Sequence, residues 1–283
     1  MTPDRAIVAR ELLDFYAAAG VDAAVGEAPA DRLATAQADI AAEAAPAPAR
    51  QPVAYSQPPA PMPPRGAPAF ALAVSPGPAA PDIAVMAARE SARSAASLDE
   101  LRAMLEKFEG CALRTTAKQL VFADGNPQAR VMFVGEAPGR EEDIEGLPFV
   151  GRSGKLLDLM MAAIGLDRTG AYIANIIPWR PPGNRTPTPQ ESQICLPFIQ
   201  RQIELVNPDV LVTLGNPSTQ ALLSTREGIM RSRGKWSDYD TGTLSIRAIA
   251  TFHPAYLLRS PSYKKMTWLD LRAIAKALQA SPS

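Results

Sequence analysis

The chain has 283 residues, of which 47% are hydrophobic, and its 29 basic side chains balance 29 acidic ones. No stretch approaches the roughly 20 apolar residues that span a membrane. Acidic residues (Asp4, Glu11 and Asp14) interrupt the first segment, where a secretory signal would be apolar. Because two cysteines cannot build a disulfide framework, we expect a cytoplasmic protein with no membrane partner.

The N-terminal third divides into two parts of different composition. Residues 1–23 carry apolar positions typical of one short amphipathic helix. Residues 24–95 are dominated by Ala and Pro and lack a periodic apolar face, which predicts a disordered linker. The short helix is a candidate docking element for a protein partner, and a helix of marginal stability is the alternative.

The folded domain is expected to cover residues 96–283. It opens with Ser97 and Glu100, a capping box ahead of a helix, and strand-like and helix-like segments then alternate. The strand candidates are 130–136, 171–179, 209–215 and 245–253, and the later helix candidates are 153–166, 188–206, 216–224 and 263–279. This alternation predicts a three-layer α/β/α fold with a central, mostly parallel four-stranded sheet.

Four polar loops follow these predicted strands. They contain GEAPG, PPGNR, GNPS and HPAYLLR, in chain order. The carboxyl ends of parallel strands lie at one edge of a sheet, so we expect these loops to meet there. Their side chains include a phenylalanine, an asparagine, a glutamate and the only histidine of the chain.

These side-chain types suit a planar ring that forms hydrogen bonds. Phe149 can stack on a ring face, and Asn175 can pair with a donor and an acceptor on one ring edge. His253 can stabilise negative charge on a carbonyl oxygen, and Glu136 can orient water or stabilise an oxocarbenium cation. The loops therefore predict a pocket for a heterocyclic base.

The motifs GEAPG-x-x-ED-x-x-G-x-PFVG-x-x-G-x-LL, Y-I-x-N, RPPGNR-x-P-T and HPAYLLR follow one another between residues 110 and 271. In this order they resemble the family 4 uracil-DNA glycosylases, and the resemblance covers essentially the whole predicted domain. It implies a uracil-DNA glycosylase fold and hydrolysis of the N-glycosidic bond of deoxyuridine in DNA. The target nucleotide would be flipped out of the helix, and an abasic site would remain. We expect a monomer.

The resemblance also implies roles for single residues. Glu136 would position the attacking water, with Glu142 and Asp143 as alternatives, and His253 would lie near the uracil O2. Phe149 would stack on uracil, and Asn175 would read its Watson–Crick edge. The substrate-binding candidates are Gly135, Ala137, Gly139, Glu142, Asp143, Phe149, Asn175 and Asn184. The DNA-binding candidates are Arg185, Leu257, Leu258, Arg259 and Lys264, of which the leucines could fill the vacated base stack.

Members of the family usually hold a 4Fe–4S cluster on four cysteines. The corresponding positions here read Phe108, Cys111, Trp179 and Cys195. Two thiolates cannot supply four ligands, so we expect a protein without the cluster or any other cofactor, in which Phe108 and Trp179 fill the vacated volume.

Two alternatives to a narrow uracil-DNA glycosylase are open. The domain could be a non-catalytic DNA-binding module that tethers a repair or replication partner through the Pro-rich arm. Alternatively, it could be a glycosylase that also accepts other deaminated or damaged bases. Base release from uracil-containing DNA distinguishes the first alternative, and competition among damaged bases distinguishes the second.

Overall fold

The computed structural model describes residues 81–280 of the chain. The predicted N-terminal helix at 1–23 and most of the predicted linker, 24–80, lie outside the described residues. None of the helices within 81–280 is long and apolar enough to cross a membrane.

One six-stranded sheet forms the centre of the fold, in the order β1-β3-β2-β4-β6-β5. Its four inner strands are mutually parallel: β2 (Val131–Gly135), β3 (Tyr172–Asn175), β4 (Val210–Leu214) and β6 (Ser245–Thr251). Antiparallel strands β1 (Asp124–Gly125) and β5 (Trp236–Asp240) are added at the two edges. The predicted parallel sheet is confirmed, and it is wider than expected because β1 is very short and β5 is mostly polar.

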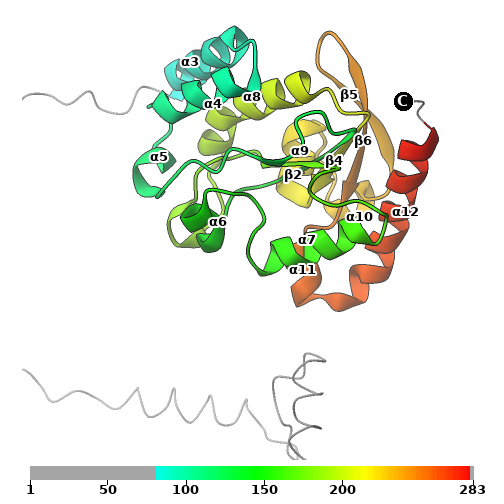
Figure 1. The fold of residues 1–283 in the computed structure, drawn as a ribbon. Coiled ribbons are helices and arrows are strands. Elements are labelled where there is room, and N and C mark those ends of the chain that lie inside the picture. The colour runs from blue at the N-terminus through cyan, green and yellow to red at the C-terminus, as the bar shows by residue number, and fades with distance from the viewer. Residues whose placement is uncertain (1–80, 281–283) are drawn as a thin grey trace, which may run out of the picture. The chain divides into compact units, whose positions relative to one another are not determined.

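Helices cover both faces of this sheet, which gives the predicted three layers (Figure 1). One face is covered by α4 (Leu98–Lys107), α8 (Pro189–Val206) and α9 (Asn216–Leu222), with α3 (Pro81–Ser94) packed on α8 and α4. The other face is covered by α7 (Arg152–Ala162), α11 (Pro254–Arg259) and α12 (Lys264–Ala280). Shorter helices are α5 (Leu113–Thr116), α6 (Arg140–Glu145), α10 (Ile229–Ser232) and the 3-10 turns η1 (Pro182–Asn184) and η2 (Pro261–Tyr263). Successive residues of β2 alternate between the two cores, with Met132 in the first and Phe133 in the second.

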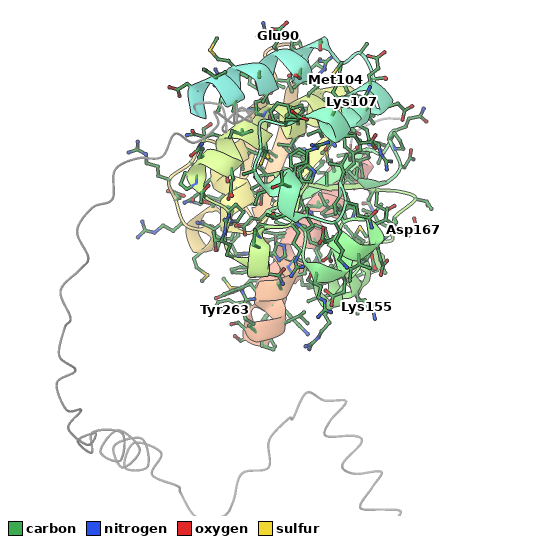
Figure 2. The ribbon with its side chains drawn as sticks, turned by 90° about the vertical axis from the view of Figure 1, so that its left-hand side faces the viewer. Glu90, Met104, Lys107, Lys155, Asp167 and Tyr263 are labelled. Atoms are coloured by element: carbon green, nitrogen blue, oxygen red, sulfur yellow. The ribbon has the colours of Figure 1, made fainter. Side chains whose placement is uncertain are left out.

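Helix α3 lies before the predicted boundary at residue 96. Its alanines Ala84, Ala88 and Ala92 recur at every fourth position and are buried in the core shared with α4 and α8. Figure 2 shows Glu90 of α3 at the top of the described part and Tyr263, just before α12, near the bottom. Residues 81–95 thus belong to the domain, because small side chains let α3 approach the helical layer closely.

The order of the strands places the functional loops. Strand β2 lies between β3 and β4, so the chain first adds β3 on one side of β2 and later adds β4 on its other side. In such sheets the crevice at the carboxyl ends of the strands, where the winding reverses, is the usual ligand site. The loops after β2, β3, β4 and β6 all begin at this edge.

Candidate active site

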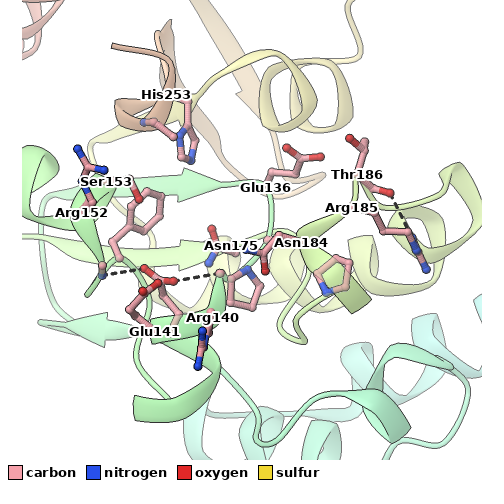
Figure 3. Close-up of a pocket in the computed structure, with 18 of the residues that line it drawn as sticks. Glu136, Arg140, Glu141, Arg152, Ser153, Asn175, Asn184, Arg185, Thr186 and His253 are labelled. Atoms are coloured by element: carbon pink, nitrogen blue, oxygen red, sulfur yellow. Dashed lines mark hydrogen bonds between the residues drawn. The ribbon is translucent and has the colours of Figure 1, made fainter. Parts of the chain in front are cut away.

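A cavity of about 540 Å³ opens at the carboxyl ends of the parallel strands. Figure 3 shows side chains from the loops after β2, β3 and β6 converging on it. The predicted residues in its wall are Glu136, Ala137, Gly139, Glu142, Phe149, Asn175, Asn184, Arg185, His253, Leu258 and Arg259. The structure thus brings together most of the predicted site, including the four side chains proposed to handle a base.

Phe149 occupies the cavity wall in a constrained backbone conformation. Its φ is +56°, in the left-handed region that side chains other than glycine rarely adopt. Its ring lies 5.5 Å from the ring of His253, centroid to centroid, with 31° between the planes. A Cβ atom added at Gly154 would lie 1.7 Å from the Phe149 carbonyl oxygen, so only glycine allows α7 to begin this close to the loop.

Asn175 lies at the end of β3, opposite Gly135 in the register of β2 and β3. A Cβ atom on Gly135 would lie 2.4 Å from Asn175 Oδ1 and 2.6 Å from Phe149 Cζ, so glycine is required between them. The Oδ1 atom is buried and accepts no hydrogen bond from the described residues. A buried amide oxygen without a partner, in the wall of a cavity, is suited to accept a hydrogen bond from a ligand.

His253 follows β6 and caps the first turn of α11. The backbone N–H of Ala255 donates to His253 Nδ1 at 3.1 Å, so in the neutral ring the proton is on Nε2. Burial, and secondarily the positive charge of Arg259, lower the pKa of His253 to about 4. At neutral pH the site therefore holds an uncharged imidazole with one N–H donor.

Glu136 follows β2 directly and lies in the cavity wall. Burial raises the pKa of its carboxyl group above the usual value. Among residues 81–280 no side chain or backbone amide pairs with this carboxylate. Its oxygens are therefore available to a ligand or a water molecule.

The two alternative carboxylates have structural partners. Glu142 accepts hydrogen bonds from the backbone N–H groups of Gly139, Val150 and Gly151 at 3.0 to 3.1 Å. Asp143 lies outside the cavity wall and is buried, where it accepts from the backbone N–H of Lys118 at 2.8 Å. Asp143 therefore faces the interior beside the loop rather than the cavity, and Glu142 holds the loop rather than presenting a free carboxylate.

The DNA-binding candidates differ in how far their side chains are exposed to solvent. Leu257 is 1% exposed and packs in the core with α7 and α12, where its side chain does not reach the surface that a DNA strand would contact. Its neighbour Leu258 is 38% exposed and lines the cavity with Arg259. Arg185 lines the other side and is ion-paired with Glu191 at 2.7 Å. Lys264 is exposed at the start of α12, outside the cavity wall.

Asn184 and Gly135 have indirect roles in the geometry. Asn184 has a φ of +55° and accepts a hydrogen bond from Arg180 Nε at 2.6 Å, which fixes the turn after β3. Gly135 is not in the wall itself but allows Asn175 and Phe149 to meet.

Several wall residues were not predicted as site residues. They are Pro138, Arg140, Glu141, Arg152, Ser153, Pro181, Thr186, Pro187 and Ala255. The sequence contained a signal that Arg152 and Ser153 belong to the site, because these polar residues follow PFVG directly and begin a helix at the cavity. Basic side chains at the mouth of a cavity suit a polyanionic ligand.

Comparisons with known proteins agree with this geometry. Residues 122–273 match the family model described as the uracil DNA glycosylase superfamily. The chain is 39% identical to the type-4 uracil-DNA glycosylase of Saccharolobus solfataricus over 191 residues, which cover 66% of this chain and 88% of the relative. It is 42% identical to that of Thermotoga maritima over 174 residues, covering 61% and 88%, and 38% identical to that of Archaeoglobus fulgidus over 184 residues, covering 64% and 92%.

The expectation of a protein without a 4Fe–4S cluster is overturned by this similarity, because type-4 enzymes are the class that the resemblance associates with such a cluster. Cys111 and Cys195 are buried with their sulfur atoms 3.8 Å apart. Phe108 and Trp179, at the other two positions, are buried in the same core. No group of three or more His, Cys, Asp or Glu side chains in residues 81–280 could hold a metal. With Phe108 and Trp179 at two of the four positions, the side chains present do not fit a four-cysteine ligand set.

Proposed function

This chain belongs to the uracil DNA glycosylase superfamily, and we propose that it hydrolyses the N-glycosidic bond of deoxyuridine in DNA, releasing uracil and leaving an abasic site. The observation that carries the proposal is the buried, unpartnered Oδ1 atom of Asn175 in the cavity wall with Phe149 and His253. That combination offers an acceptor, an aromatic face and a neutral donor to one planar ring.

Uracil would be recognised by the side chains of Asn175 and Phe149. Asn175 Oδ1 would accept from the N3–H of the base, and the amide nitrogen of the same side chain would donate to O4. The ring of Phe149 would stack on the base. Cytosine presents an acceptor at N3 and a donor at the neighbouring position, so the same amide orientation would leave both of its groups mismatched.

Bond cleavage would use Glu136 and His253. As the C1′–N1 bond breaks, its electron pair passes to the uracil ring and positive charge develops on the sugar. The ionised Glu136 would stabilise that charge and accept a proton from the water that attacks C1′. The Nε2–H of His253 would donate to uracil O2, where negative charge accumulates. The neutral imidazole that the lowered pKa of His253 provides carries its one proton on Nε2, where it can donate this bond.

The DNA strand would lie across the mouth of the cavity. Leu258 is the exposed leucine of α11 and would fill the stack that the flipped nucleotide leaves. Arg259 and Arg185 in the cavity wall, and Lys264 nearby in the sequence, would contact phosphates.

Base release tests the function directly. A duplex with one uracil is incubated with wild-type protein, Glu136→Gln or Glu145→Gln, and abasic sites are cleaved with alkali. Glu145 is exposed on α6 outside the cavity wall and serves as the control from the same loop. We expect release by wild type and Glu145→Gln and a loss of about 10²-fold or more in Glu136→Gln. Binding of the duplex without release by the wild type would instead indicate a DNA-binding module.

We propose that the protein acts as a monomer in the cytoplasm, that residues 1–23 dock a partner protein, and that the catalytic domain starts at α3. Duplexes containing hypoxanthine, xanthine or ethenocytosine test whether the site accepts other damaged bases. Light scattering of the purified full chain tests the monomer.

A further inference from the structure

Arg168 lies outside the cavity, in the turn between α7 and β3, and contacts the segment that carries Phe149. Its Nη1 atom donates to the carbonyl oxygen of Pro148 at 3.1 Å, and its Nη2 atom donates to the carbonyl oxygen of Phe149. One guanidinium group therefore binds two consecutive carbonyl groups of the loop.

Two carboxylates fix the orientation of this guanidinium. Arg168 Nε donates to Asp158 Oδ1 of α7 at 2.9 Å, and Nη1 pairs with Asp124 Oδ2 of β1 at 2.5 Å. The planar fork of arginine can make all of these bonds at once, which the single ammonium of lysine cannot. Arg168 thus connects the edge strand, α7 and the loop of Phe149.

The segment that Arg168 holds is under backbone strain. A non-glycine residue in the left-handed region is strained and persists where its surroundings fix it. Phe149 is such a residue, with a φ of +56°. Its carbonyl side is held by Arg168, and the following amides of Val150 and Gly151 are held by Glu142.

We propose that Arg168 is a positioning residue for base release, acting through the ring of Phe149. By binding the carbonyl groups of Pro148 and Phe149, it keeps the ring against Gly135 and beside His253, where the ring can stack on a flipped base. This inference rests on the proposed glycosylase function, since the ring acts on a base only if one is bound.

A double-mutant cycle tests the inference. Single-turnover release of uracil from a duplex is measured for wild type, Arg168→Ala, Phe149→Ala and the double variant. Misplacement of a stacking ring should lower the rate of Arg168→Ala by about 10-fold or more. If Arg168 acts through the ring, its removal in the Phe149→Ala background should cost less than about 2-fold. Equal losses in both backgrounds, or an unchanged rate in Arg168→Ala, would overturn the proposal.

Arg201 provides a matched control. Its side chain is 27% exposed against 25% for Arg168, it donates to the carbonyl oxygen of Ala95, and it pairs with Glu204 at 2.6 Å. Arg201→Ala should lower the melting temperature while leaving the release rate unchanged. If Arg168→Ala does not fold, the same cycle is run with Arg168→Lys. Absence of release by the wild type would instead contradict the function itself.

Discussion

Asn175 buries an amide oxygen for which the described residues supply no donor. Leaving a buried polar atom unpaired costs about 1 to 3 kcal/mol, so the folded domain is less stable than it would be with an apolar side chain there. Gly135 contributes to this arrangement, because any side chain at that position would displace the amide. The cost is offset only when a ligand donates to Oδ1, which is the situation that the proposed function provides.

Replacing Asn175 with alanine should therefore separate activity from stability. We expect the kcat/KM for uracil release from Asn175→Ala to fall by about 10²-fold or more, because both hydrogen bonds to the base are lost. The melting temperature should stay the same or rise, since the unpaired oxygen is removed. Release kinetics and thermal unfolding measure the two effects. If the variant loses stability and activity together, the inference that Asn175 Oδ1 lacks a hydrogen-bond partner is contradicted.

The state of His253 can be observed directly, because it is the only histidine in the chain. Its lowered pKa predicts that the imidazole resonances of the untagged protein titrate near pH 4 and report the Nε2–H tautomer at neutral pH. Since the unfolded chain binds the proton near pH 6.5 and the folded chain near pH 4, this group lowers the stability as the pH falls through that window. An imidazole that titrates near its ordinary value would exclude a buried neutral donor.

Ionisation of Glu136 should determine the pH dependence of base release. Because burial raises the pKa of its carboxyl group, the ionised form that the mechanism needs is lost at a higher pH than for an exposed glutamate. We expect single-turnover release to decline on acidification through this raised pKa, with His253 still neutral there. The pH–rate profile of the wild type measures it, and the residual rate of Glu136→Gln should lack this acidic limb.

At the scale of single elements, α11 shows how far a sequence can specify a site. The HPAYLLR sequence indicates that two leucines follow the histidine, but only the phase of the helix determines which of them reaches the cavity. Pro254 begins the helix, and the core then takes Leu257 while Leu258 faces outward. A prediction made without the helix boundary could not separate the two.

Adjacent leucines of α11 should accordingly give opposite phenotypes. Leu257→Ala should lower the free energy of unfolding by about 2 to 5 kcal/mol, because it opens a cavity in the core. Leu258→Ala should leave the stability nearly unchanged and slow uracil release from duplex DNA by about 10-fold, with a smaller effect on single strands that need no unstacking. Denaturant unfolding and release assays on both substrates compare the pair. The reverse pattern would contradict the phase of the helix.

For the whole molecule, the parallel sheet and the loops at its carboxyl edge were predictable because each inner strand is a short apolar run. Strand β5 was not predictable, because its WSDYD sequence, at an exposed edge of the sheet, contains no apolar run. Arg168 was missed for a different reason: its partners Asp124, Asp158 and Phe149 are up to 44 residues away and converge only in the fold. Local patterns predict elements, whereas contacts between distant loops depend on the complete packing.

Truncations on either side of helix α3 test where the domain starts. Its composition resembles the Ala-rich and Pro-rich segment before it, but its alanines recur at every fourth position and pack against α8. Deleting residues 1–80 should leave melting temperature and uracil release unchanged. Deleting residues 1–95 should lower the free energy of unfolding by about 3 kcal/mol, the scale of exposing about 120 Å² of apolar surface. Because the cavity is formed by loops after β2, β3 and β6, release at low temperature should survive. Equal stability of the two truncated proteins would show that α3 is not part of the core.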